Sequence, residues 1–159
     1  MAVTTRIEEV RKEVTEMAKA APTAQDLMHS MVKLLHDRML KYNWVGFYLL
    51  EPGAQPPMLV LGAFEGAMTP HTRIPLNQGI CGAAASSGQT VVVDDVSKDP
   101  RYLACSLETK SEIVVPVFVH GKVAGELDID SHFAAAFPAE DRELVEYCAR
   151  LVGKRLESA

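Results

Sequence analysis

The sequence predicts an α+β domain in which a central, largely antiparallel β-sheet carries the N- and C-terminal helices packed on one face. Three observations lead to this fold class. Apolar residues recur at helical spacing at both ends of the chain, strand-length apolar runs occupy its middle, and turn residues join neighbouring runs as hairpins. Residues 1–159 are expected to form a single domain, with helices over 1–41 and the sheet and last helix over 43–159.

Two helices are predicted before the sheet. The first runs from Thr4 to about Ala20, and the second follows after Ala21-Pro22, with Thr23 as its N-cap. The apolar stripe of the first helix is Ile7, Val10, Val14 and Met17. The stripe expected for the second helix is Leu27, Met31, Leu34, Leu35 and Leu40.

The middle of the chain changes from helical to strand-like patterning. The elements expected here are strands at 43–50, 58–64 and 73–75, a helix over 79–85 and a strand at 90–93. Pro52-Gly53 closes the first strand with a turn, and Gly88 stops the short helix because glycine favours a helix C-terminus.

The last third of the chain combines a long loop, a hairpin and a helix. The elements expected are a loop over 94–109, strands at 112–119 and 122–130, and a helix that begins near Pro138. His120-Gly121 supplies the tight turn of the hairpin. The last helix is expected to bury Leu144, Val145, Cys148, Leu151 and Val152. A loop as long as 94–109 in a compact domain is usually functional.

Composition excludes several classes of function. The 159 residues carry 16 Lys and Arg against 21 Asp and Glu, a net charge of −5, without the basic cluster of a nucleic-acid-binding face. The apolar runs are too short to cross a bilayer, and the first twenty residues lack a signal-peptide core. Three cysteines without a C-x-x-C pair argue against a disulfide framework or a structural metal and favour a cytoplasmic location.

The strand at 122–130 places an acidic group on one face. Because strand side chains alternate, Glu126, Asp128 and Asp130 point to one side while Leu127 and Ile129 point to the other. Three like charges at this spacing predict a raised pKa or a cationic ligand. A solvated sheet face explains the same pattern equally well.

Trp44 and Tyr48 share one face of the first strand, since they are four residues apart. They could form the aromatic wall of a small-ligand pocket. Two aromatic side chains on a strand face are more often part of the core, and the spacing does not decide between these interpretations.

The three cysteines differ in their expected surroundings. Cys105 lies in the long loop, where a cysteine is a candidate for redox or nucleophilic chemistry. Cys81 lies at the start of the short helix, where unpaired backbone N–H groups favour a thiolate, although a small buried cysteine between glycines is the commoner case. Cys148 falls on the apolar stripe of the last helix and is expected in the core.

Five motifs together resemble one family. They are Asn43-Trp44-Val45-Gly46-Phe47-Tyr48, Ile80-Cys81-Gly82, Ala104-Cys105, Ser111-Glu112-Ile113-Val114-Val115-Pro116 and Leu127-Asp128-Ile129-Asp130-Ser131. With these motifs the chain resembles the free methionine-(R)-sulfoxide reductases, a family of GAF domains, from Asn43 to the last helix. The resemblance implies a GAF-like fold and an enzyme that reduces free L-methionine (R)-S-oxide to methionine.

The resemblance also implies roles for individual residues. Cys105 would attack the sulfoxide sulfur and Cys81 would resolve the resulting sulfenic acid. The other site residues that it implies are Glu112, Asp128 and Asp130 for proton transfer and substrate binding, and Trp44 and Tyr48 for substrate binding. It implies thioredoxin as the external reductant, no metal and no organic cofactor, and a homodimer.

The chain departs from the family's usual pattern at several positions. His71 stands where the family commonly has a further cysteine that often serves as the main resolving thiol. Arg101-Tyr102 and Ser106 differ from the usual loop, and Glu126 occupies a position that tends to be apolar. Two alternatives therefore stay open: a non-catalytic GAF module that binds a small molecule, and a thiol-based redox sensor built on Cys81 and Cys105.

Overall fold

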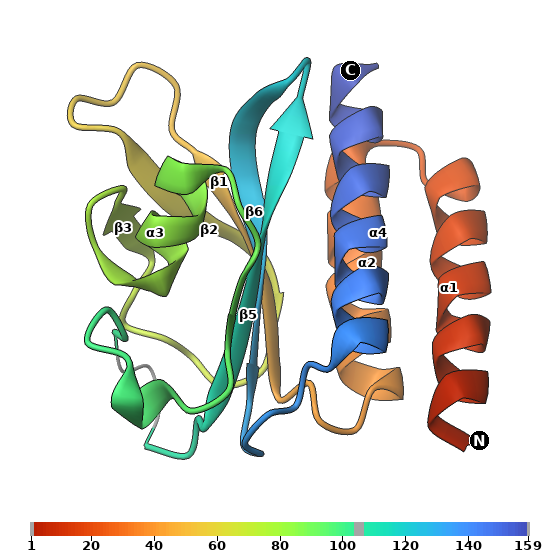
Figure 1. The fold of residues 1–159 in the computed structure, drawn as a ribbon. Coiled ribbons are helices and arrows are strands. Elements are labelled where there is room, and N and C mark those ends of the chain that lie inside the picture. The colour runs from red at the N-terminus through yellow and green to blue at the C-terminus, as the bar shows by residue number, and fades with distance from the viewer. Residues whose placement is uncertain (1, 104–106, 159) are drawn as a thin grey trace.

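The protein is a six-stranded antiparallel sheet with helices on both faces (Figure 1). The computed structural model describes residues 2–103 and 107–158. Its helices are α1 (Ala2–Ala20), α2 (Ala24–Arg38), α3 (Gly79–Ser87) and α4 (Ala139–Glu157), with a short 3₁₀ helix η1 (Val96–Lys98). Its strands are β1 (Trp44–Leu50), β2 (Met58–Glu65), β3 (Arg73–Pro75), β4 (Val91–Val93), β5 (Ser111–Val119) and β6 (Lys122–Ser131).

The sheet has the strand order β3-β2-β1-β6-β5-β4, and each neighbouring pair is antiparallel. The hairpin of β5 and β6 turns at His120-Gly121, where both residues have positive φ angles of 51° and 77°. Positive φ at both central positions matches the twist of a two-residue hairpin. The predicted α+β fold class is confirmed. Strands β1 and β6 lie at the centre of the sheet, and each pairs with a strand on both sides.

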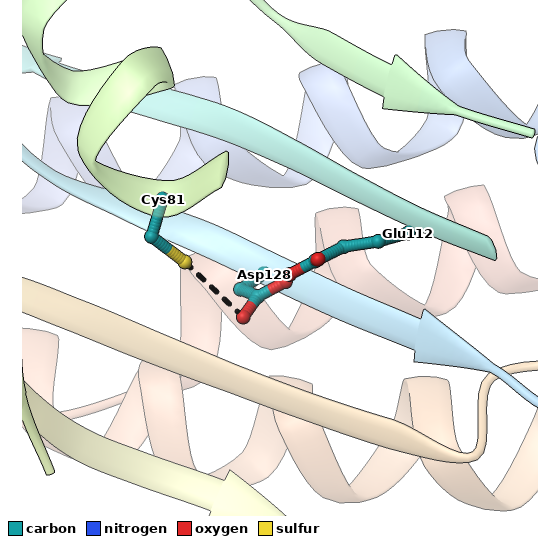
Figure 2. A group of neighbouring side chains, drawn as sticks. All are labelled: Cys81, Glu112 and Asp128. Carbon is teal, nitrogen blue, oxygen red and sulfur yellow. Dashed lines mark hydrogen bonds between the residues drawn. The ribbon is translucent and has the colours of Figure 1, made fainter. Parts of the chain in front are cut away.

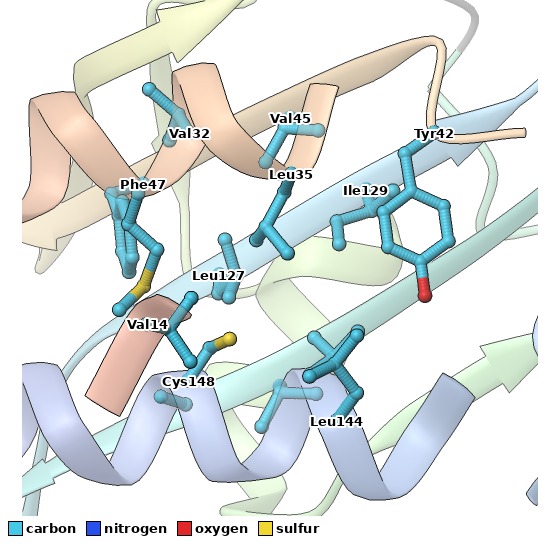
Figure 3. Close-up of a cluster of buried hydrophobic side chains, with 14 of the residues drawn as sticks. Val14, Val32, Leu35, Tyr42, Val45, Phe47, Leu127, Ile129, Leu144 and Cys148 are labelled. Atoms are coloured by element: carbon cyan, nitrogen blue, oxygen red, sulfur yellow. The ribbon is translucent and has the colours of Figure 1, made fainter. Parts of the chain in front are cut away.

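One face of the sheet builds the main core. Helix α2 packs on β1 and β2, helix α4 packs on β5 and β6, and α1 covers both helices as an outer layer (Figure 1). The apolar side chains that meet there include Val45 and Phe47 from β1, and Leu127 and Ile129 from β6 (Figure 3). Their burial supplies the main driving force for folding, since removing apolar surface from water is the dominant favourable term.

Helix α2 begins as predicted and ends slightly earlier. The Thr23 side chain accepts a hydrogen bond from the backbone N–H of Asp26, which satisfies one of the unpaired donors of the first turn. The helix ends at Arg38, so Leu40 lies beyond it and is 77% exposed. The prediction that Leu40 belongs to the buried stripe is therefore wrong, and Met28 and Val32 complete that stripe instead.

The opposite face of the sheet is covered by α3 and by the segments around it (Figure 1). Helix α3 ends at Gly88, whose left-handed conformation gives the C-cap expected from the sequence. A second apolar cluster forms here, with Ile80 and Ala84 of α3 against Val114 of β5. Within the described part of the chain, this face carries the predicted site residues Trp44, Tyr48, Cys81, Glu112, Asp128 and Asp130. None of the helices in the described part of the chain combines the length and apolarity that a membrane span requires.

Candidate active site

The pairing register brings the acidic and aromatic residues onto the same face of the sheet. Trp44 lies opposite Asp130 and Tyr48 lies opposite Glu126 across the pairing of β1 with β6. On the other side of β6, Asp130 lies opposite Glu112 of β5. Directly opposed residues in antiparallel strands share a face, so the five side chains form one group beneath α3.

Gly46 allows the Trp44 ring to lie flat along this face. A Cβ atom at Gly46 would stand 2.7 Å from Cζ3 of Trp44, closer than real Cβ atoms approach. The ring stacks on Phe64 at 5.7 Å between centroids, and its Nε1 donates a hydrogen bond of 3.0 Å to the carbonyl of Ala67. Trp44 is therefore held in one orientation by both its ring and its N–H group.

Tyr48 is fixed in the same way by the connection between β2 and β3. Its hydroxyl donates a hydrogen bond of 2.6 Å to the carbonyl of His71, and its ring lies 6.3 Å from that of Trp44. Both aromatic residues are buried and belong to the second apolar cluster. The two interpretations of these residues are compatible, because each side chain packs in the core and lines a cavity.

The acidic face is buried, so the interpretation of a solvated sheet face is wrong. Glu112, Glu126, Asp128 and Asp130 are each at most 5% exposed. The cover is provided by α3, whose Cys81 lies directly above β6 (Figure 2). The Cys81 thiol donates a hydrogen bond of 3.3 Å to Oδ2 of Asp128.

The thiol of Cys81 is held in its protonated form. Burial raises its pKa well above the usual range, and the charges of Asp128 and Glu126 raise it further. Of the two interpretations of Cys81, the small buried cysteine is therefore confirmed and the thiolate at the start of α3 is not. The desolvation and the nearby acids outweigh the partial positive charge of the helix terminus.

The three acids of the predicted site differ in how readily they ionise. Burial raises the pKa of Glu112 well above its usual range, with further increases from the charges of Asp128 and Asp130. The pKa of Asp130 is raised in the same way, by burial and then by the charge of Asp128. Burial raises the pKa of Asp128 as well, but hydrogen bonds from Glu112, Cys81 and Asp130 favour its ionised form and limit the increase. Within this coupled group Asp128 is the acid that ionises most readily, while Glu112 and Asp130 hold their protons to higher pH.

A small cavity lies between α3 and the acids. Its volume is about 20 Å³, and its polar walls are Cys81, Glu112, Asp128, Tyr48 and His71. Leu103 closes one side and packs on Gly79, where a Cβ atom would lie 2.8 Å from Cδ1 of Leu103. A cavity of this size holds about one water molecule.

A second pocket of about 120 Å³ lies on the other side of the acid group. Trp44, Asp130 and Thr109 line it, together with His132, whose Nε2 lies 3.5 Å from Oε2 of Glu108. The two hollows thus flank the pair of Glu112 and Asp130. Thr109 and His132 could not be assigned to this pocket from the sequence, because neither belongs to a recognisable motif.

The predicted cysteines have separate outcomes. Cys105 lies outside the described residues, so its predicted role is carried by the family resemblance. Cys148 is fully buried in the main core, as expected from its place on the stripe of α4 (Figure 3). His71, which stands where the family commonly has a further cysteine, lines the same cavity as Cys81.

Glu126 is an unusual buried acid. It is fully buried, and among the described residues none donates a hydrogen bond to either carboxyl oxygen. Burial raises its pKa well above the usual range; the neighbouring Cys81 thiol opposes this shift, and the charge of Asp128 adds to it. The folded state therefore retains a proton that the unfolded state releases above about pH 4.3, so this group's contribution to stability falls as the pH rises.

We expect Glu126→Leu to raise the free energy of unfolding by about 1–3 kcal/mol near pH 8, because it removes an unpartnered buried carboxyl group. The gain should shrink towards pH 4, where the carboxyl group is protonated in both states. Urea unfolding at the two pH values measures this. Glu143→Gln on the exposed side of α4 is the matched control. Destabilisation by Glu126→Leu at both pH values would contradict the account.

Comparison with known proteins identifies the family. The family model for the GAF domain matches residues 23–156. The chain is 41% identical to the type II free methionine-R-sulfoxide reductase from Thermoplasma acidophilum, with a TM-score of 0.79 over 85% of this chain and 93% of that one. The chain belongs to the free methionine-R-sulfoxide reductase family of GAF domains. This membership confirms the resemblance seen in the sequence motifs.

Two further relatives of this GAF domain support the assignment. The free methionine-R-sulfoxide reductase from Neisseria meningitidis, solved in complex with its substrate, is 35% identical, with a TM-score of 0.88 over 96% of this chain and 89% of that one. The free methionine-R-sulfoxide reductase of Saccharomyces cerevisiae is 42% identical over 113 residues, which are 70% of this chain and 62% of the yeast protein. The match therefore spans less than two thirds of the yeast protein.

Proposed function

We propose that this GAF domain is an enzyme that reduces free L-methionine (R)-S-oxide to methionine. The observation that carries the proposal is the group of buried acids that share one cavity wall with the Cys81 thiol, in a chain whose relatives are named for this activity. Burying Glu112, Asp128 and Asp130 on one sheet face costs folding free energy. The proposal explains this cost, because ionisable groups with shifted pKa values cluster at functional sites.

In the proposed first step the thiolate of Cys105 attacks the sulfoxide sulfur. The transient bond between the two sulfur atoms and the S–O bond of the sulfoxide then break as the oxygen is transferred to the Cys105 sulfur, so that methionine leaves as the reduced product and Cys105 becomes a sulfenic acid. The oxygen needs a proton as it leaves sulfur, and Glu112 and Asp130 are the acids whose raised pKa values keep a proton available. We assign this donation to Glu112, which lies in the same cavity wall as Asp128.

In the proposed second step the Cys81 thiol condenses with the sulfenic acid of Cys105. A disulfide forms and water leaves. Asp128 would accept the thiol proton, and the hydrogen bond that its Oδ2 accepts from Cys81 supports this role. A dithiol protein such as thioredoxin then reduces the disulfide, so that no bound cofactor takes part.

Recognition of the free amino acid is proposed to depend on charge. Asp128 is the acid that ionises most readily, and a carboxylate in a desolvated cavity pairs strongly with an ammonium group. Trp44 and Tyr48 would line the path of the substrate side chain, as both are fixed in orientation. The cavity of about 20 Å³ has to widen for this substrate, and Leu103 is the side chain closing it.

The test is NADPH consumption coupled through thioredoxin and thioredoxin reductase. We expect turnover with free L-methionine (R)-S-oxide, and a value of kcat/KM at least about tenfold lower for the N-acetylated substrate, because a charge-assisted hydrogen bond is lost. Equal use of both substrates would contradict the assignment of Asp128. Binding without turnover in this assay and in a single-turnover assay would favour the non-catalytic alternative.

Two family expectations remain predictions. A homodimer is expected, and light scattering of the purified protein measures it directly. A cytoplasmic location is also expected, and fractionation of the source cells tests it.

A further inference from the structure

Three side chains around the small cavity form a compact mixed donor set (Figure 2). Sγ of Cys81 and one carboxyl oxygen each from Glu112 and Asp128 lie within 4.8 Å of one another, and all three residues are buried. They come from three different elements, α3, β5 and β6. The three residues are far apart in the sequence, and the fold brings them together.

The spacing of these atoms is close to that of a tetrahedral ion site. Zinc takes sulfur at about 2.3 Å and oxygen at about 2.0 Å, which separates the two ligand atoms by about 3.5 Å at a tetrahedral angle. Sγ of Cys81 lies 3.3 Å from Oδ2 of Asp128. Small side-chain movements would bring Glu112 to the same distance, since its nearest carboxyl oxygen is already within 4.8 Å of both.

The cavity itself gives a second and independent observation. The three donors line a hollow of about 20 Å³, which suits one water molecule or one ion. Oδ1 of Asp128 is buried, and no described residue donates a hydrogen bond to it. A buried carboxyl oxygen without a donor, in the wall of a cavity of this size, indicates a position suited to a cation.

The side chains around the cavity can supply anionic ligands to a cation. Its described walls contain two acids and a cysteine, without a lysine or an arginine. A thiolate ligand favours zinc over magnesium or calcium, which prefer oxygen ligands.

We propose that the reduced, substrate-free site binds a divalent cation of the zinc class through Cys81, Glu112 and Asp128. Binding releases the protons of these groups to solvent, with no change in oxidation state. The fourth position is left for water, as in a zinc site with three protein ligands. The ion occupies the place of the substrate ammonium group and engages the resolving thiol, so it holds the enzyme inactive. Binding of the cation does not depend on the proposed reductase activity, whereas this inhibition does.

The binding test uses the full chain carrying Cys105→Ser, kept reduced, in which Cys81 and Cys148 are the remaining thiols. Competition for Zn²⁺ with a chromophoric chelator should show one site per chain. Adding Cys81→Ser or Glu112→Gln should weaken the affinity at least about tenfold, whereas Cys148→Ala should leave it unchanged. Circular dichroism checks that each variant folds.

Co²⁺ gives a readout that does not require the site variants to fold. The Cys105→Ser protein loaded with one equivalent of Co²⁺ should show a thiolate-to-cobalt absorption band in the near ultraviolet, and Cys148→Ala should retain it. The proposal is overturned if the band is absent, or if Zn²⁺ binds equally well to folded Cys81→Ser. Since the Cys105→Ser background lacks the proposed nucleophile, these outcomes are independent of whether the enzyme reduces methionine sulfoxide.

Discussion

Replacing Cys105 with serine is expected to lower the rate of free methionine-(R)-sulfoxide reduction by on the order of 10³-fold or more, because a hydroxyl group cannot replace the nucleophilic thiolate. Methionine formed in a rapid single turnover, without any reductant, measures this step directly. The loss should appear in the first turnover and not only in recycling.

The other two cysteines provide matched controls for this variant. Cys148→Ala should keep at least half of the activity, because Cys148 lies in the main core on the opposite face of the sheet. Cys81→Ser should slow repeated turnover more than the first one, since Cys81 is assigned to resolving the sulfenic acid. Full activity of Cys105→Ser would show that another residue is the nucleophile.

Glu112→Gln is expected to lower the first-turnover rate by about 10²–10⁴-fold, the range typical of a lost general acid. The amide keeps the shape of the side chain but has no proton to donate at the required acidity. In the wild type the rate should decline as the pH rises through the raised pKa of Glu112, and the variant should lose this decline.

Two observations separate this role from simple loss of structure. Glu143→Gln on the exposed side of α4 should leave the rate unchanged. Thermal melting should show that Glu112→Gln remains folded. If the folded variant retains the wild-type rate and pH profile, proton donation belongs to another group, with Asp130 as the next candidate.

Local patterns in the sequence predicted most of the fold. The alternation in residues 126–130 correctly assigned Leu127 and Ile129 to one face and the acids to the other, because this rule depends only on strand geometry. Thr23 as an N-cap and Gly88 as a helix stop were predicted for the same local reasons. The prediction that Leu40 is buried was wrong because helix α2 ends before this residue. Helix ends depend on contacts that the periodicity of the sequence does not contain.

The state of the site could not be predicted in the same way. The solvent exposure of Glu126 and Asp128 depends on α3, which covers β6 only in the folded chain. Helix α3 precedes β6 by more than thirty residues, so a local pattern does not contain this contact. For Cys81 the sequence left a thiolate at a helix terminus and a small buried cysteine both open, because the acids below the helix that raise its pKa were not visible in the local pattern. The family motifs nevertheless marked residues that lie together in the fold: Trp44, Tyr48, Glu112, Asp128 and Asp130 share one face of β1, β5 and β6, and Cys81 of α3 lies above them.

The most direct test of the account counts thiols and methionine in one experiment. Reduced protein is mixed with excess free L-methionine (R)-S-oxide without thioredoxin, quenched in acid, and analysed for methionine and remaining thiols. The account predicts one methionine per chain, the loss of Cys105 and Cys81 as a disulfide, and an intact Cys148 thiol. The account would be contradicted if the wild-type protein formed no more methionine than the Cys105→Ser protein and kept all three of its own thiols.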